Sequence, residues 1–235
     1  MRILQNIVSI GLCLLAVCGM KAQTIAFSNT YKPGATLYVS TASGIVLRAK
    51  ADPAGTQIEV LPYGREVVVQ PNASPSVAFT NNNIKGVWVK VKAGDKEGFV
   101  FDGYLSRYIP IELPKKGRGV ELSDYLRANF KTKSESNKGD DSSAVEYLKI
   151  IFQNGIVYES KLSEGGYTET TRIPVSVYTF QEVYLLARVR YDYILATPRC
   201  AYKEDLMTCD NEEELSVVTI EKSGLYYIVT RSTAD

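Results

Sequence analysis

The sequence predicts two domains, a small closed all-β unit followed by an α+β domain whose antiparallel sheet carries one main helix. Between Thr36 and Leu105, short runs rich in Val, Ile and Leu alternate with Gly-bearing turns and show no helical period. Residues 131–143 then contain no apolar side chain. Beyond them, strand patterns surround a single helical pattern that begins at Phe180.

Composition narrows the functional classes. The 235-residue chain is 45% hydrophobic and 23% charged, as in ordinary folded proteins. Its formal net charge of +1 gives no reason to expect a nucleic-acid partner or electrostatic binding to a membrane. Histidine is absent, which excludes Ser/His and Cys/His catalysis and His-ligated metals. We therefore expect a protein that is not an enzyme and needs no cofactor.

Residues 1–22 have the pattern of a signal peptide. Arg2 supplies the positive charge, and Ile7–Val17 is an apolar run too short to span a bilayer. Small residues follow and predict cleavage after Ala22, so that the mature chain starts at Gln23 without a transmembrane segment. The end of this leader resembles signal peptides of the Bacteroidetes. The expected location is the periplasm or the cell surface.

A lipid anchor is the alternative. Leu15–Cys18 resembles a lipobox, which would be acylated at Cys18. Because Val17 stands where such motifs have Gly, Ala or Ser, the sequence favours simple cleavage.

Residues 23–110 make up the first predicted domain. Turn signals at Asp52–Gly55 and Pro62–Gly64, and a tight hairpin at Ala93–Gly98, separate its strands. A long loop is predicted over residues 71–86, which hold two Pro and three consecutive Asn. The predicted strands are Thr36–Ser40, Ile45–Ala49, Gln57–Leu61, Arg65–Gln70, Val87–Lys92 and Phe99–Phe101.

Three sequence pieces in this domain resemble the bacterial SH3-like (SH3b) family. Val46–Arg48 matches the family's first motif strand, and Leu61–Val67 matches its "L-x-x-G-x-x-V" turn and strand. Gly86–Val91, followed by Gly98–Val100 and Tyr104-Leu105, matches its closing motif. The resemblance covers less than a third of the chain and implies an SH3-like barrel.

The same resemblance implies a binding role. Such domains hold extended peptides in a shallow groove of aromatic rings, often against the cell wall. The candidate ligand-binding residues here are Tyr38, Tyr63, Trp88 and Tyr104. Peptide, peptidoglycan or an envelope protein is the expected partner. The alternative is that Trp88 and Tyr104 belong to the core or rim of the barrel. Phe99 departs from the family pattern, which has a second Trp there.

Residues 111–143 are predicted as a linker that contains a short helix, Val120–Phe130, and ends in a mobile polar spacer over 131–143.

Residues 144–235 are predicted to form the α+β domain. Its main helix, Phe180–Tyr193, follows a capping-box pattern at Thr179 and Glu182. Its predicted strands are Tyr147–Gln153, Ile156–Lys161, Tyr167–Ile173, Leu215–Glu221 and Tyr226–Thr230, three before the helix and two after it.

Cys200 and Cys209 are the cysteines of the mature chain and favour a disulfide that closes a loop in an exported protein. The alternative is a thiol nucleophile, which would lack a His partner and C-x-x-C spacing. The neighbouring acidic run from Asp210 to Glu214 has no EF-hand spacing, so we expect a solvated loop and no metal.

These observations lead to an exported, non-enzymatic binding protein. An accessory or assembly role in an envelope protein complex is the second hypothesis. A cell-wall hydrolase that uses two carboxylates is a third, although no pair of acidic residues stands out.

Overall fold

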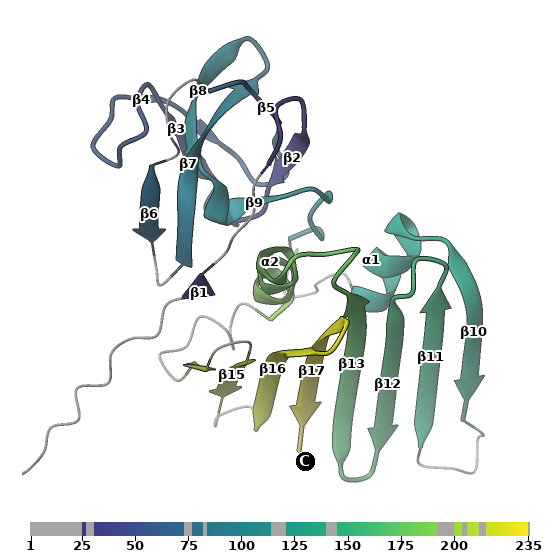
Figure 1. Ribbon diagram of the computed structural model, residues 1–235. Helices are drawn as coiled ribbons and strands as arrows, with labels where there is room; N and C mark the ends of the chain where they lie inside the picture. Colours follow the sequence, from purple (N-terminus) through teal and green to yellow (C-terminus); the bar gives the residue numbers. More distant parts are fainter. Residues whose placement is uncertain are drawn as a thin grey trace, which may run out of the picture.

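The computed structural model describes residues 25–26, 31–72, 77–81, 84–113, 121–139, 145–191, 200–203, 206–211 and 215–234. Within them the protein is mainly β and has two mostly antiparallel sheets and two helices (Figure 1). The predicted signal peptide, with Cys18, lies outside the described residues. We refer to residues 25–113 as the first unit and to residues 121–234 as the second unit.

The first sheet follows the strand order β4-β3-β8-β7-β5-β2-β9, and β1 and β6 pair with β7 off this path. Its end strands β4 and β9 do not pair with each other. The prediction of a β unit is confirmed, but within the described residues the predicted closed barrel is not formed. A single 3₁₀ turn, η1, precedes β9. The elements are β1 (Ile25–Ala26), β2 (Thr36–Val39), β3 (Ile45–Arg48), β4 (Gln57–Leu61), β5 (Glu66–Val69), β6 (Ala78–Asn81), β7 (Ile84–Ala93), β8 (Lys96–Phe101), η1 (Asp102–Tyr104) and β9 (Leu105–Ser106).

Strand β7 is the longest in this sheet, and it has two sets of partners. Its first half pairs with β6, and its second half pairs with β5; β8 runs antiparallel to it from Trp88 onward. The prediction of a long loop over 71–86 is therefore wrong for Ala78–Asn81 and for the start of β7. Strand β6 alternates between exposed and half-buried side chains, a weak pattern that the neighbouring Pro and Asn residues obscured.

The second sheet is antiparallel throughout, in the order β10-β11-β12-β13-β17-β16-β15-β14. Helix α2 packs on β16 and β17 and faces the first unit, as Figure 1 shows. The elements are α1 (Leu122–Asn129), β10 (Thr132–Lys138), β11 (Glu146–Phe152), β12 (Val157–Ser163), β13 (Gly166–Pro174), α2 (Phe180–Arg190), β14 (Ala201–Lys203), β15 (Leu206–Asn211), β16 (Ser216–Ser223) and β17 (Tyr226–Thr233).

Two differences enlarge this sheet beyond the prediction. Thr132–Lys138, expected as part of a mobile spacer, is edge strand β10 and pairs with β11. Every side chain of β10 is exposed, so the strand is held in the sheet by backbone hydrogen bonds. Because it has no alternating apolar residues, the sequence pattern did not indicate a strand. The lysines and glutamate of this strand also discourage pairing with other chains at the open edge.

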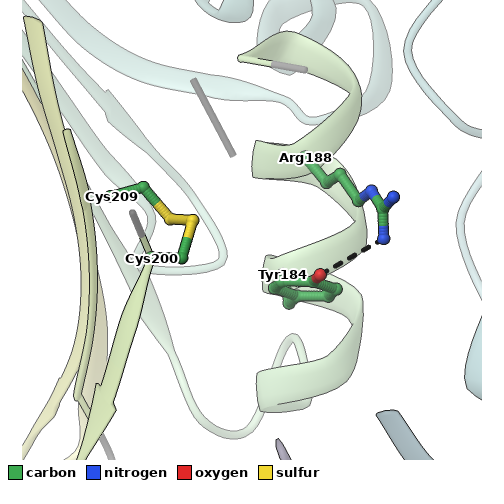
Figure 2. The surroundings of a disulfide bond; sticks show 4 residues. All are labelled: Tyr184, Arg188, Cys200 and Cys209. Atoms are coloured by element: carbon green, nitrogen blue, oxygen red, sulfur yellow. Dashed lines mark hydrogen bonds between the residues drawn. A yellow bond between two sulfur atoms is a disulfide. The ribbon is translucent and has the colours of Figure 1, made fainter. Parts of the chain in front are cut away.

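At the far edge, the predicted loop between the cysteines is a hairpin of β14 and β15. The predicted disulfide between Cys200 and Cys209 is present, and it lies beside helix α2 in Figure 2. Cys209 is fully buried.

Helix α2 begins at the predicted capping box. Thr179 Oγ1 accepts from the backbone N–H of Glu182, and the Glu182 carboxylate accepts from the backbone N–H of Thr179. The helix ends at Arg190, earlier than the predicted Tyr193. Its hydrophobic residues from Val183 to Val189 are all buried, because the helix lies between the first sheet and the second.

The Glu182 carboxylate also binds Arg107 of the first unit. Its side chain is 0% exposed and accepts from Arg107 Nε at 2.9 Å and Arg107 Nη2 at 2.7 Å. The backbone N–H of Arg107 donates to the same carboxylate at 2.9 Å. The neighbouring Gln181 amide donates to the carbonyl oxygens of Asp102 and Leu105. One helix turn thus binds the end of the first sheet through both backbone and side chain.

Aromatic packing continues this interface. The rings of Tyr108 and Tyr178 stack with centroids 4.2 Å apart, and Tyr108 Oη donates to the Val177 carbonyl at 2.7 Å. Tyr125 of α1 donates to the Ile109 carbonyl at 2.8 Å, and burial raises the pKa of its hydroxyl to about 12. The buried hydrophobic side chains of both units form one continuous cluster. The two units therefore share a core.

The Glu182 interaction predicts strong coupling between the units. Arg107→Met leaves a buried carboxylate without its cation and should lower the free energy of unfolding by about 3 kcal/mol. Glu182→Gln should also destabilise, but the double variant should lose less than the sum, with a coupling free energy of about 1–3 kcal/mol. Urea unfolding of the four proteins measures this cycle, and strictly additive losses would contradict the assignment.

The disulfide predicts a second effect on stability. On the chain-entropy model, a loop of this length stabilises by about 2.5–3 kcal/mol. Cys200→Ala combined with Cys209→Ala should lower the free energy of unfolding by that amount. Thermal unfolding of the oxidised, reduced and double-alanine proteins provides the measurement. A reduced protein as stable as the oxidised one would contradict the prediction.

Candidate functional site

The candidate site is a cleft of about 390 Å³ that contains Trp88, and we call it the Trp88 cleft. It opens where β3, β6, β7 and β8 of the first unit meet helix α2 of the second. Its walls are Thr41, Ser43, Gly44, Ile45, Val46, Arg48, Pro53, Phe79, Asn81, Trp88, Phe101, Tyr104 and Arg188. Both units therefore contribute to it.

Four aromatic rings form a continuous series in this cleft. Trp88 and Phe79 lie 5.4 Å apart between ring centroids, and Phe79 meets Phe101 edge to face at 5.3 Å. Phe101 meets Tyr104 edge to face at 5.4 Å. Such edge-to-face packing fixes the rings in place, so the aromatic wall is preformed.

The charged side chains of the cleft are both cations. Arg48 lies on β3 and donates to the Gly55 carbonyl at 2.7 Å, while Arg188 on α2 donates to the Tyr184 hydroxyl at 3.3 Å. Figure 2 shows Tyr184 and Arg188 on successive turns of the helix, joined by this hydrogen bond. No Asp or Glu is among the residues that line the Trp88 cleft. The charged side chains on its walls are thus both positive.

Two further clefts adjoin this one. The Leu185 cleft, about 520 Å³, lies between residues 40–43 and α2 and shares Tyr104 and Arg188 with the Trp88 cleft. The Tyr63 cleft, about 620 Å³, is lined by apolar residues such as Val60 and Ile109. Ser43, which is exposed, lines all three clefts. The three clefts therefore adjoin one another at Ser43.

The structure brings together two of the four predicted ligand-binding residues, Trp88 and Tyr104. Tyr63 lies in the adjoining cleft, where its hydroxyl donates to the Ile111 carbonyl at 2.6 Å. Burial raises the pKa of that hydroxyl. Tyr38 is half-buried on β2 and lines none of these three clefts.

Trp88 and Tyr104 differ in their relation to the core. Side chains alternate along a strand, so Trp88 and Val91 point to opposite faces of β7. Val91 belongs to the shared hydrophobic cluster. Trp88 is also buried, and its ring lies against Phe79, which packs on that cluster. Tyr104 belongs to the core cluster and also reaches the cleft. Trp88 is 4% and Tyr104 9% exposed, so the predicted alternative of a core or rim position fits both.

Sequence reasoning missed four residues of the site. Phe79 was placed in a loop, and Phe101 was treated only as the end of a strand. Arg48 closes a motif strand but was not named as a ligand-binding residue, and Arg188 carried no motif. The two lie 140 positions apart in the sequence. The alternation Ala78-Phe79-Thr80 was the available signal for Phe79, but no local pattern could place α2 against the first sheet.

The buried carboxyl of Asp102 binds the backbone of β7 next to Trp88. Asp102 is 2% exposed, and its Oδ1 accepts from the backbone N–H of Val87 at 2.7 Å. The approach is so close that a Cβ at Gly86 would lie 2.3 Å from this oxygen, which explains the glycine. Burial raises the pKa of Asp102 to about 6, although hydrogen bonds from backbone N–H groups oppose the shift.

Other kinds of site have less support. Over the described ranges, no group of three or more His, Cys, Asp or Glu side chains is arranged to hold a metal ion. No helix in the same ranges is long and apolar enough to cross a membrane.

Comparison with known proteins does not add a family assignment. No protein-family model, curated protein or solved structure matches this chain.

The raised pKa of Asp102 predicts a specific pH dependence. Because the folded protein prefers the neutral carboxyl, this group's contribution to stability is complete below about pH 4 and is lost as the pH rises through about 6. Between pH 4 and pH 7 the wild type should lose about 2 kcal/mol of unfolding free energy relative to Asp102→Asn, which keeps an acceptor for Val87. Urea unfolding across this pH range measures the difference.

Asp95→Asn, at an exposed position, is the matched control and should keep the wild-type profile. If the unfolding free energies of the wild type and Asp102→Asn changed in parallel with pH, the burial of ionised Asp102 would have no cost, which would contradict the prediction.

Proposed function

We propose that this chain is an exported binding protein that uses its first unit, an SH3-like domain, to contact a peptide or the cell envelope. The observation that carries the proposal is the aromatic wall of the Trp88 cleft. Preformed aromatic grooves bind extended peptides with little rearrangement, since rigid rings lose little conformational entropy. The three sequence pieces that resemble the SH3b family contribute Trp88 and Tyr104 to this wall.

Two further features agree with an exported role. The leader predicts secretion, and a disulfide such as Cys200–Cys209 persists in oxidising compartments. The adjoining Leu185 and Tyr63 clefts extend the binding surface beyond the aromatic wall.

A role as an assembly component of an envelope protein complex is the second candidate. It is favoured by the apolar Tyr63 cleft, where Val60 and Ile109 are 49% and 57% exposed. Apolar side chains gathered in this way fit a protein surface better than a wall polymer. Stoichiometric co-purification with an envelope protein would favour this role if Val60→Asp abolished the co-purification.

A cell-wall hydrolase is the least supported candidate, because no carboxylate lines the Trp88 cleft.

The test is co-sedimentation of residues 23–235 with purified peptidoglycan sacculi. Ser43→Trp places a bulky ring where the three clefts meet, at an exposed position that leaves the core intact. We expect the wild type to pellet and Ser43→Trp to stay in the supernatant.

Ser223→Trp makes the same substitution at an exposed position on β16, outside the clefts, and should pellet as the wild type does. Equal pelleting of both tryptophan variants would contradict a role for the clefts. If no protein pellets, the wall polymer is excluded as the ligand.

A further inference from the structure

We propose that the Trp88 cleft binds an acidic peptide and that Arg48 and Arg188 hold a carboxylate of that peptide. This inference rests on the proposed binding role of the cleft and specifies the chemistry of its ligand. It also makes the second unit part of the binding site, since Arg188 comes from α2.

The first argument is the charge of the cleft. Arg48 and Arg188 have no ion pair with any carboxylate in the part of the chain that the structure describes. Arg107 and Arg127, by contrast, lie within 2.7–2.8 Å of carboxylate oxygens. Two arginines without a carboxylate partner, in a cleft with no acidic wall residue, leave a positive potential for a ligand to neutralise.

The second argument is donor capacity. A guanidinium has five N–H groups, and each of these arginines has one hydrogen bond to the protein through Nη1. The remaining N–H groups can form the paired hydrogen bonds that guanidinium makes with carboxylates. The hydroxyls of Thr41 and Ser43 and the amide of Asn81 supply further donors on the same walls.

The third argument is the indole of Trp88. Its Nε1 is buried, and it has no hydrogen-bond partner among the described residues. A buried N–H without a partner costs free energy, which an incoming acceptor could recover after a small shift of the ring.

The shape of the surface favours a peptide over a small anion. The aromatic series gives the cleft a rigid apolar wall, and the Leu185 cleft, which has no acidic wall residue, adjoins it at Ser43. The Tyr63 cleft is less suited to an acidic chain because Glu112 lines it. A chain that alternates apolar and acidic residues matches rings, apolar clefts and arginines at once, whereas an isolated anion uses the arginines alone.

Trp88 is the only tryptophan of the chain, so its indole N–H gives a single reporter signal. The experiment titrates ¹⁵N-labelled residues 23–235 with a capped nonapeptide that alternates alanine and glutamate, and with the same peptide carrying glutamine in place of glutamate. We expect a saturable shift of the indole resonance with the glutamate peptide and at least about tenfold weaker binding of the glutamine peptide.

Arg48→Gln and Arg188→Gln should each weaken binding of the glutamate peptide by about tenfold. Arg65→Gln removes the same charge from an exposed position outside the clefts and should bind as the wild type does. Backbone resonances that otherwise match the wild type show that each variant is folded. Unchanged affinity in both cleft variants would overturn the proposal.

The remaining outcomes separate this inference from the proposed function. Equal shifts with both peptides would leave a peptide-binding cleft but overturn its preference for carboxylates. A shift with inorganic phosphate as large as that with the peptide, at equal concentration, would overturn the peptide as ligand. No shift with any probe, together with loss of sacculus binding in Ser43→Trp, would overturn the acidic peptide while the binding function stands.

Discussion

The structure depends on one buried carboxylate. Glu182 is fully excluded from solvent, which is costly for a charged group unless it is paired and hydrogen-bonded. It accepts from the N-terminus of its own helix and from the backbone and guanidinium of Arg107 in the other unit. The pairing raises the pKa of the Arg107 guanidinium. A single side chain therefore both starts α2 and fixes where the helix lies.

The position of α2 determines which residues line the clefts. Once Gln181 and Glu182 bind the end of the first sheet, the next turns of α2 face residues 40–44, and Leu185, Arg188 and Val189 become cleft walls. The Trp88 cleft is thus an aromatic wall from one sequence region closed by an arginine from another. An isolated first unit would keep the rings and Arg48 but lose Arg188. It would also expose the core that it shares with the second unit.

Local patterns in the sequence predicted the local features well. The capping box at Thr179 and the disulfide both depend on residues close in sequence, and each is present. Strands β6 and β10 were missed because backbone pairing holds them and they lack a buried apolar face. Trp88 and Tyr104, which the resemblance to the SH3b motif suggested as groove residues, line one cleft. Arg188 could not be predicted, since its place depends on the docking of α2 through Glu182.

Calorimetry of residues 23–235 tests the central claim most directly, that the two units fold as one body around Glu182. The shared core predicts a single unfolding transition whose calorimetric and van't Hoff enthalpies agree. Two separate transitions, or a calorimetric enthalpy well above the van't Hoff value, would show that the units unfold independently and would contradict this account.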